Sequence, residues 1–153
     1  MEITPDDIID RNKPCLYLRS SCIGNPGIGG WGAVLEYRDE TEQISGNIAY
    51  TTNNRLEILA AVEGVSILPA GSPVQIFTTS DYLFQGATKW VHGWRRRDWK
   101  KTSGLVIANA DLWQRLDKVM ESAEIRWINA KGRSDPGLKA ASKLASDAAR
   151  LLK

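Results

Sequence analysis

Apolar and polar residues alternate along the first third of the chain in the way that is typical of β-strands. Apolar side chains recur with a period of two, and short polar turns separate the runs. The pattern predicts three strands in succession, over residues 15–22, 30–38 and 41–50. Because only Asp39 and Glu40 separate the second run from the third, these two strands are expected to form an antiparallel hairpin.

Beyond residue 52 the spacing becomes helical. Apolar residues recur every three or four positions, which predicts amphipathic helices, and two short apolar runs predict further strands over residues 74–78 and 124–128. The first helix is expected to start at a cap on Asn53 or Asn54, to bury one apolar face and to end near Leu68. The other helices are expected over residues 81–89, 91–96, 109–121 and 136–152.

This order of elements predicts an α/β protein with a single domain over residues 15–153. Residues 1–14 are expected to be an N-terminal extension. Within it, residues 4–7 (TPDD) have the cap, proline and acids of a helix start. A single helical turn and a mobile arm both remain open for this segment.

The composition suits one globular domain, since 42% of the 153 residues are hydrophobic and 25% are charged. No apolar run approaches the roughly 20 residues that span a bilayer, and the acidic N-terminus lacks a signal-peptide core. Cys15 and Cys22 fall at the two ends of one expected strand, too far apart to bridge, and free thiols fit a reducing compartment. The sequence therefore predicts a cytoplasmic protein without a membrane partner.

Four segments, in order, match those of one enzyme family. They are CIGNPG with GGWGA (residues 22–27 and 29–33), TTNNRLE (51–57), the tryptophan-rich segment 85–100, and DLWQRLD (111–117). With their spacing, they make the chain resemble type 1 ribonuclease H from about residue 15 to residue 153. The resemblance implies the ribonuclease H-like fold, an α/β fold with a mixed five-stranded sheet and helices on both faces.

The resemblance also implies a metal site, in which three aspartates and a glutamate hold two magnesium ions that cleave the RNA strand of an RNA–DNA hybrid. Only Glu57 matches a carboxylate position. Arg19, Thr79 and Ser142 stand at the three aspartate positions, and Arg133 stands at that of a mobile histidine. One carboxylate cannot hold two magnesium ions, so the sequence predicts no bound metal, no cofactor and no functional catalytic residue. Arg19 is expected to form an ion pair with Glu57 instead.

A second group of residues is expected to bind nucleic acid. Residues 89–101 hold six basic residues and three tryptophans and resemble the family's basic protrusion, in which Trp94 and Trp99 are expected to pack and Trp90 to face the ligand. Arg38 and Thr52 match one DNA-phosphate pocket. The full set of expected binding residues is Asn25, Arg38, Thr52, Asn53, Gln85, Trp90, Arg95, Arg96, Arg97, Lys100 and Lys101.

These observations predict a pseudo-ribonuclease H, not an enzyme, that binds duplex DNA or an RNA–DNA hybrid without cleaving it. One alternative is a protein-interaction scaffold built on the same fold, with a protein as its partner. The other is an active ribonuclease H with an atypical metal site. Strong salt-dependent binding would separate the first hypothesis from the second, and magnesium-dependent cleavage would reveal the third.

Overall fold

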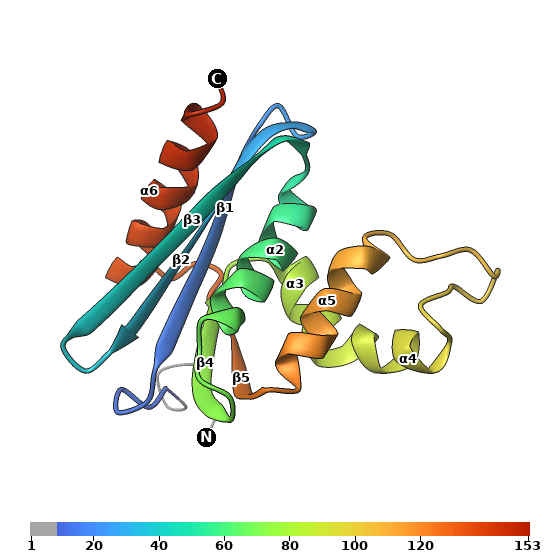
Figure 1. The fold of residues 1–153 in the computed structure, drawn as a ribbon, viewed down its shortest axis with the longest axis horizontal. Coiled ribbons are helices and arrows are strands. Elements are labelled where there is room, and N and C mark those ends of the chain that lie inside the picture. The colour runs from blue at the N-terminus through green and yellow to red at the C-terminus, as the bar shows by residue number, and fades with distance from the viewer. Residues whose placement is uncertain (1–8) are drawn as a thin grey trace.

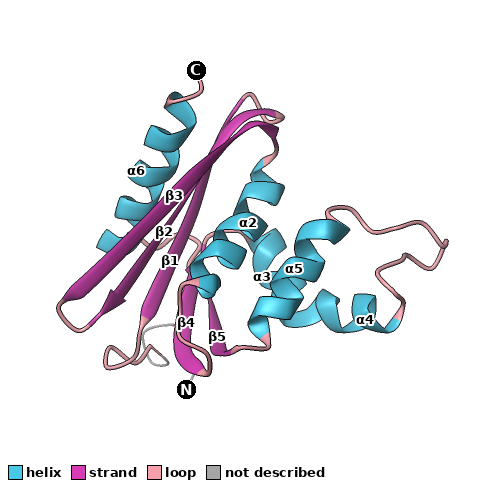
Figure 2. Ribbon diagram, in the orientation of Figure 1, coloured by secondary structure: helices cyan, strands magenta, loops and turns pink. Residues whose placement is uncertain are grey.

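The structure is a computed structural model that describes residues 9–153. A five-stranded sheet forms its middle layer, and helices cover both faces of the sheet (Figure 1 and Figure 2). The α/β class and the ribonuclease H-like architecture expected from the sequence are thereby confirmed. The helix start expected at residues 4–7 lies outside the described residues.

Each expected strand is present and slightly longer than expected. The strands are β1 (Cys15–Ile23), β2 (Gly27–Tyr37), β3 (Glu40–Thr51), β4 (Ser72–Thr78) and β5 (Ala123–Asn129). They lie in the order β3-β2-β1-β4-β5. The first three are antiparallel, whereas β4 runs parallel to both β1 and β5, so the sheet is mixed.

The helices follow the expected positions with two differences. They are α2 (Asn53–Ser66), α3 (Asp81–Gln85), α4 (Val91–Arg96), α5 (Ala110–Met120) and α6 (Pro136–Arg150). The helix expected over residues 81–89 is divided into α3 and a π-helical turn, η1 (Gly86–Trp90), which leads directly into α4. Thr52, rather than an asparagine, caps α2 by accepting a hydrogen bond from the Arg55 amide. Moreover, α2 is buried almost all round, because it lies between the sheet and α5.

Strand β1 is buried on both faces and connects two cores. Leu16 and Leu18 enter the core beneath α2 and α5, and Cys15 and Tyr17 enter the core beneath α6. Helix α6 lies directly on β2, since a Cβ atom added at Gly32 would be 2.4 Å from the carbonyl oxygen of Ala141. This close approach sets α6 against the sheet beside Arg19 of β1, which lies opposite Gly32.

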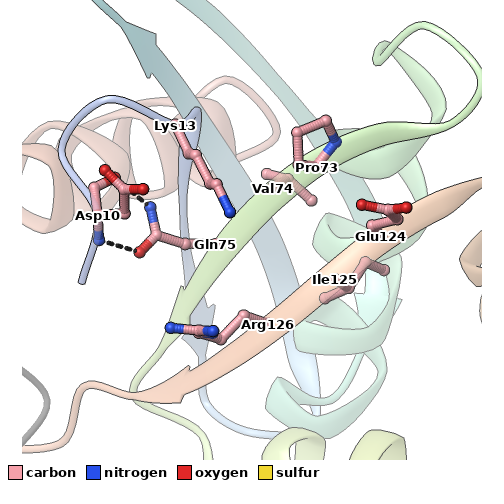
Figure 3. A pocket seen from close by; sticks show the side chains of 8 residues that line it. All are labelled: Asp10, Lys13, Pro73, Val74, Gln75, Glu124, Ile125 and Arg126. Atoms are coloured by element: carbon pink, nitrogen blue, oxygen red, sulfur yellow. Dashed lines mark hydrogen bonds between the residues drawn. The ribbon is translucent and has the colours of Figure 1, made fainter. Parts of the chain in front are cut away.

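The chain segment before β1 is also held on the fold. Asp10 and Gln75 exchange two hydrogen bonds, of 2.6 and 2.7 Å, beside a cavity of about 390 Å³ (Figure 3). Ile9 packs against the core beneath α6. The boundary at residue 15 between extension and domain stays a prediction.

Both cysteines of β1 are free thiols, with Cys15 buried and Cys22 half-buried. Within residues 9–153, no helix combines the length and the apolar character that crossing a bilayer requires. The cytoplasmic location inferred from the sequence stays a prediction.

Candidate functional site

The four positions aligned with the metal site meet at one end of the sheet. Leu18 of β1 lies beside Thr78 of β4, so Arg19 and Thr79 follow on adjoining strands. Ser142 of α6 lines the same pocket as Arg19. Glu57 of α2 reaches the next residue of β1, Ser20, whose hydroxyl donates to Glu57 Oε1 over 2.7 Å.

The expected ion pair between Arg19 and Glu57 is absent from the described residues, and that prediction is wrong. Successive residues of a strand point to opposite faces of the sheet. Arg19 lies opposite Gly32, and directly opposed residues share a face, which at Gly32 is the face covered by α6. Ser20 therefore faces α2 and meets Glu57, while Arg19 faces α6.

Glu57 is buried and poorly solvated. The residue is only 7% exposed, and its Oε2 atom accepts no hydrogen bond within the described part of the chain. Burial raises the pKa of Glu57 from 4.5 to about 7, against the smaller lowering effects of the Ser20 hydrogen bond and the Arg19 charge. Near neutral pH this carboxyl group is therefore a mixture of protonated and ionised forms.

This raised pKa predicts a pH-dependent stability. Between pH 4.5 and about 7 the folded chain holds a proton on Glu57 that the unfolded chain releases, so stability falls as pH rises through this window and stays lower above it. The variant Glu57→Gln cannot ionise. It should raise the free energy of unfolding at pH 8 by about 3 kcal/mol and change it little at pH 4.5. Urea denaturation at the two pH values measures both effects.

The matched control is Glu63→Gln on the same helix. The Glu63 side chain is 40% exposed and pairs with Arg115, so its replacement should change stability by less than about 1 kcal/mol at either pH. An equal gain for Glu57→Gln at both pH values would contradict the assigned ionisation.

The residues at this position do not fit a pair of magnesium ions held by four carboxylates. Magnesium favours carboxylate oxygens in octahedral geometry, and Glu57 supplies one buried carboxyl group here. Within residues 9–153, no three His, Cys, Asp or Glu side chains come together in a way that could hold a metal ion. Arg133 makes a two-point ion pair with Asp135, at 2.8 and 3.0 Å, and the guanidinium lowers the pKa of Asp135.

Three of the expected nucleic-acid contacts lie together at the start of α2. The amide of Asn53 donates to the side-chain oxygen of Asn25 over 3.1 Å, which joins the β1–β2 loop to the helix. Thr52 is the cap of the same helix. The Ser20 hydroxyl also lies 3.4 Å from the side-chain oxygen of Asn53, so this cluster borders the Glu57 position.

Arg38 does not join this cluster, which corrects the expectation that it shares a pocket with Thr52. The two residues lie beyond opposite ends of β3, whose 12 residues span about 40 Å at the usual rise per residue. Arg38 instead lies over the ring of Tyr37, 5.1 Å from its centroid.

The basic segment, here called the protrusion (residues 89–101), extends away from the sheet together with the loop that follows it (Figure 1). Trp94 and Trp99 pack against the core beneath α2 and α5, as expected, whereas Trp90 is 41% exposed. Gln85 lies at the end of α3, just before η1, with its amide 3.4 Å from Asp81 Oδ1.

The arginines of the protrusion differ in their partners. Arg95 was expected to bind nucleic acid. Instead, it forms a two-point ion pair with Asp117 of α5 and anchors the protrusion. Arg96 and Arg97 are exposed. In the described part of the chain neither has a carboxylate within ion-pair distance, and the same holds for Lys100 and Lys101.

A set of contacts that sequence reasoning missed links the start of α2 to the protrusion. Arg55 donates to the side chains of Asn109, at 3.2 Å, and Asp111, at 3.0 and 2.7 Å. Asn109 donates to the Tyr82 hydroxyl, and the Tyr82 ring packs edge-on against Trp90. These partners are far apart in sequence, so no local pattern could have revealed them.

Comparison with known proteins places this arrangement in a family. A family model described as RNase H matches residues 11–150. The chain belongs to the RNase H family. It is 43% identical to the ribonuclease H of Edwardsiella ictaluri over 119 residues, which cover 78% of this chain and 77% of the relative. It is also 43% identical to that of Maricaulis maris over 134 residues, covering 86% of this chain and 90% of the relative.

A solved structure of the RNase H family is similar over nearly the whole chain. It is LC9-RNase H1, a type 1 RNase H with the type 2 active-site motif, which is 28% identical and superposes with a TM-score of 0.78. The match covers 95% of this chain and 75% of that protein. The resemblance to type 1 ribonuclease H inferred from the sequence is thereby confirmed.

The relatives contradict the prediction that this chain is not an enzyme. Proteins named ribonuclease H are 38 to 43% identical to it over most of its length, which points to an enzyme. The prediction rested on three side chains, at Arg19, Thr79 and Ser142, whereas the relatives match along nearly the whole fold. The side chains at these positions are thus unusual ones in a member of the family.

Proposed function

We propose that this chain binds an RNA–DNA hybrid along the surface that runs from the start of α2 to the protrusion. The observation that supports the proposal most directly is the group of exposed cations on the protrusion, without carboxylate partners in the described chain, beside the exposed ring of Trp90. The name of the relatives supports a hybrid as the ligand, and duplex DNA is the alternative.

The two ends of this surface suit different parts of a duplex. Cations on the protrusion would contact phosphates and give binding its salt dependence. The side chains of Asn25 and Asn53 would contact sugars and base edges, and Thr52 would contact a phosphate. The chain of contacts through Arg55, Asn109 and Tyr82 holds the two ends in a fixed relation, which lowers the ordering cost of binding.

Hydrolysis of the RNA strand is the second candidate function, and the names of the relatives favour it. A cleavage assay on a labelled hybrid, with magnesium, with manganese and with EDTA, tests it in the same preparation that is used for binding. Host nuclease must be removed first, since a trace of it would imitate activity. If the chain neither binds nor cleaves nucleic acid at physiological salt, the protein-interaction scaffold is favoured instead.

Removing two cations from the protrusion should weaken binding in a salt-dependent way. The variant Arg96→Gln with Arg97→Gln should lower the slope of log affinity against log salt by about 1.8, since each lost phosphate contact contributes about 0.9 on duplex DNA. Binding should weaken similarly on unrelated sequences, because phosphates carry no sequence information. Fluorescence anisotropy with hybrid and duplex DNA, between low and physiological salt, measures the slope.

The control for charge alone is Arg115→Gln. Arg115 lies on α5 and pairs with Glu63 over 3.3 Å, so its loss should leave the slope unchanged. Arg95 is kept in all variants because its ion pair with Asp117 holds the protrusion in place. If the double variant keeps the slope of the parent, the protrusion is not the phosphate-binding surface.

A further inference from the structure

A second cationic surface lies where α6 meets the end of β1, on the opposite face of the sheet from Glu57. It is a pocket of about 510 Å³. Arg19 enters it from β1, and Lys139, Lys143 and Arg150 enter it from α6. Asp147 is the only carboxylate in its lining, so four positive charges and one negative charge leave a net charge of +3.

The charges in this pocket are incompletely balanced. Asp147 is shared between Lys143, at 2.6 Å, and Arg150, at 3.1 Å. Arg19 and Lys139 have no carboxylate within ion-pair distance among the residues that the structure describes. Glu57 forms no ion pair with Arg19, because it lies on the other face of β1 and accepts a hydrogen bond from Ser20. Unbalanced like charges repel one another, and an anion between them relieves that repulsion.

We propose that this pocket binds a phosphodiester group of nucleic acid directly, through Arg19 and Lys139. The guanidinium of Arg19 offers paired donors whose geometry matches phosphate oxygens, and Lys139 adds a mobile ammonium group from the first turn of α6. The hydroxyl of Ser142 lines the same pocket and can donate a further hydrogen bond. This inference rests on the proposed function for the identity of the ligand.

Two residues of the pocket, Arg19 and Ser142, stand at positions where the resemblance to type 1 ribonuclease H implies aspartates that hold metal ions. There, a phosphate would be held through cations bound to carboxylates. Here the side chains carry the positive charge themselves, so binding of the phosphate should need no divalent ion. Hybrid affinity is therefore expected to be the same in EDTA as in magnesium at equal ionic strength.

The first experiment removes the two cations without carboxylate partners. In the full chain, Arg19→Gln with Lys139→Gln should weaken hybrid binding in EDTA by on the order of tenfold at 0.15 M salt and lower the salt slope by about 1.8. The control Lys118→Gln removes an exposed lysine from α5, on the other face of the sheet, and should change affinity by less than about twofold. Circular dichroism checks that the variants are folded, and Lys139→Gln alone, at an exposed position, gives a milder version of the test.

The second experiment uses inorganic phosphate, followed by the NMR signal of the Ser142 amide, which is present both in the parent and in the double variant. Saturable shifts in the parent that are lost in the double variant support the pocket. If the parent binds hybrid and the double variant binds it equally well, the pocket proposal is overturned while the proposed function stands. If the parent binds no hybrid but phosphate gives those shifts, the pocket stands and the proposed function fails. Equal shifts in parent and double variant also overturn the pocket.

Discussion

Replacing Arg19, Thr79 and Ser142 together by aspartate should raise the magnesium-dependent rate of RNA-strand cleavage by more than about a hundredfold. Even residues one step removed from a metal are worth roughly 10–100-fold in metal affinity or activity, and direct ligands are worth more. Arg19 and Thr79 directly follow the paired residues Leu18 and Thr78, Ser142 lines the same pocket as Arg19, and Glu57 bonds Ser20, the next residue of β1. The change supplies three hard oxygen ligands and makes the site more negative by four charges, two from Arg19 and one from each of the others. Cleavage of a labelled hybrid as a function of magnesium concentration measures the effect.

The matched control places asparagine at the same three positions. Asparagine has nearly the shape of aspartate but no charge, so this variant should gain little dependence on magnesium. In EDTA, the aspartate variant should also bind hybrid more weakly than the parent, since it loses the cation of Arg19 and adds negative charge to the pocket. If the aspartate and asparagine variants respond alike to magnesium, the alignment of these positions with a metal site is wrong.

The sheet could be predicted from the sequence because burial leaves a local signal in strands. Leu16 and Leu18 face one core and Tyr17 faces the other, which produces the apolar run that marked β1. Helix α2 was harder to interpret, since a helix enclosed between a sheet and another helix has no single apolar face. Glu57 is one of the α2 residues that are buried because the helix is enclosed in this way. At Gly86, where the π-helical turn begins, the backbone lies against the ring of Trp113, a partner that lies far along the chain.

The site positions could be aligned from the sequence, but their partners could not. The spacing of motifs aligned Arg19, Thr79, Glu57 and Ser142 with the family's metal site, an assignment that stays a prediction, and the structure brings Arg19 and Ser142 into one pocket. The expected pair of Arg19 with Glu57 failed because the pleat of β1 decides which face each side chain meets.

The partner of Arg95 was also missed. Asp117, which holds Arg95, is 22 residues away. Lys139 and Lys143 are four residues apart, so the sequence places them on one face of a helix. That they line a pocket together with Arg19 follows only once the face of the sheet that Arg19 meets is known.

The variant Gly86→Ala should destabilise the fold by about 3 kcal/mol, which is the upper part of the usual range for overpacking a core. Gly86 has helical backbone angles, φ −61° and ψ −48°, so alanine would ordinarily be favoured there. However, the added Cβ atom would lie 2.1 Å from the Trp113 ring. That ring is fully buried, donates its indole N–H to the Tyr82 hydroxyl over 3.0 Å and packs against Trp94, so it has little freedom to move. Urea denaturation measures the loss.

The same substitution at Gly93 is the control, and its effect should have the opposite sign. Gly93 lies in α4, and the nearest atom to an added Cβ is Arg97 Nη1, at 3.4 Å, the end of a flexible side chain. Without a clash, the helix propensity of alanine should raise the free energy of unfolding by about 0.5–1 kcal/mol. Equal stability of the two variants would show that the Trp113 ring can shift, and the anchoring of the protrusion to α5 would then depend on Arg95 and Asp117 rather than on the packing around Trp113.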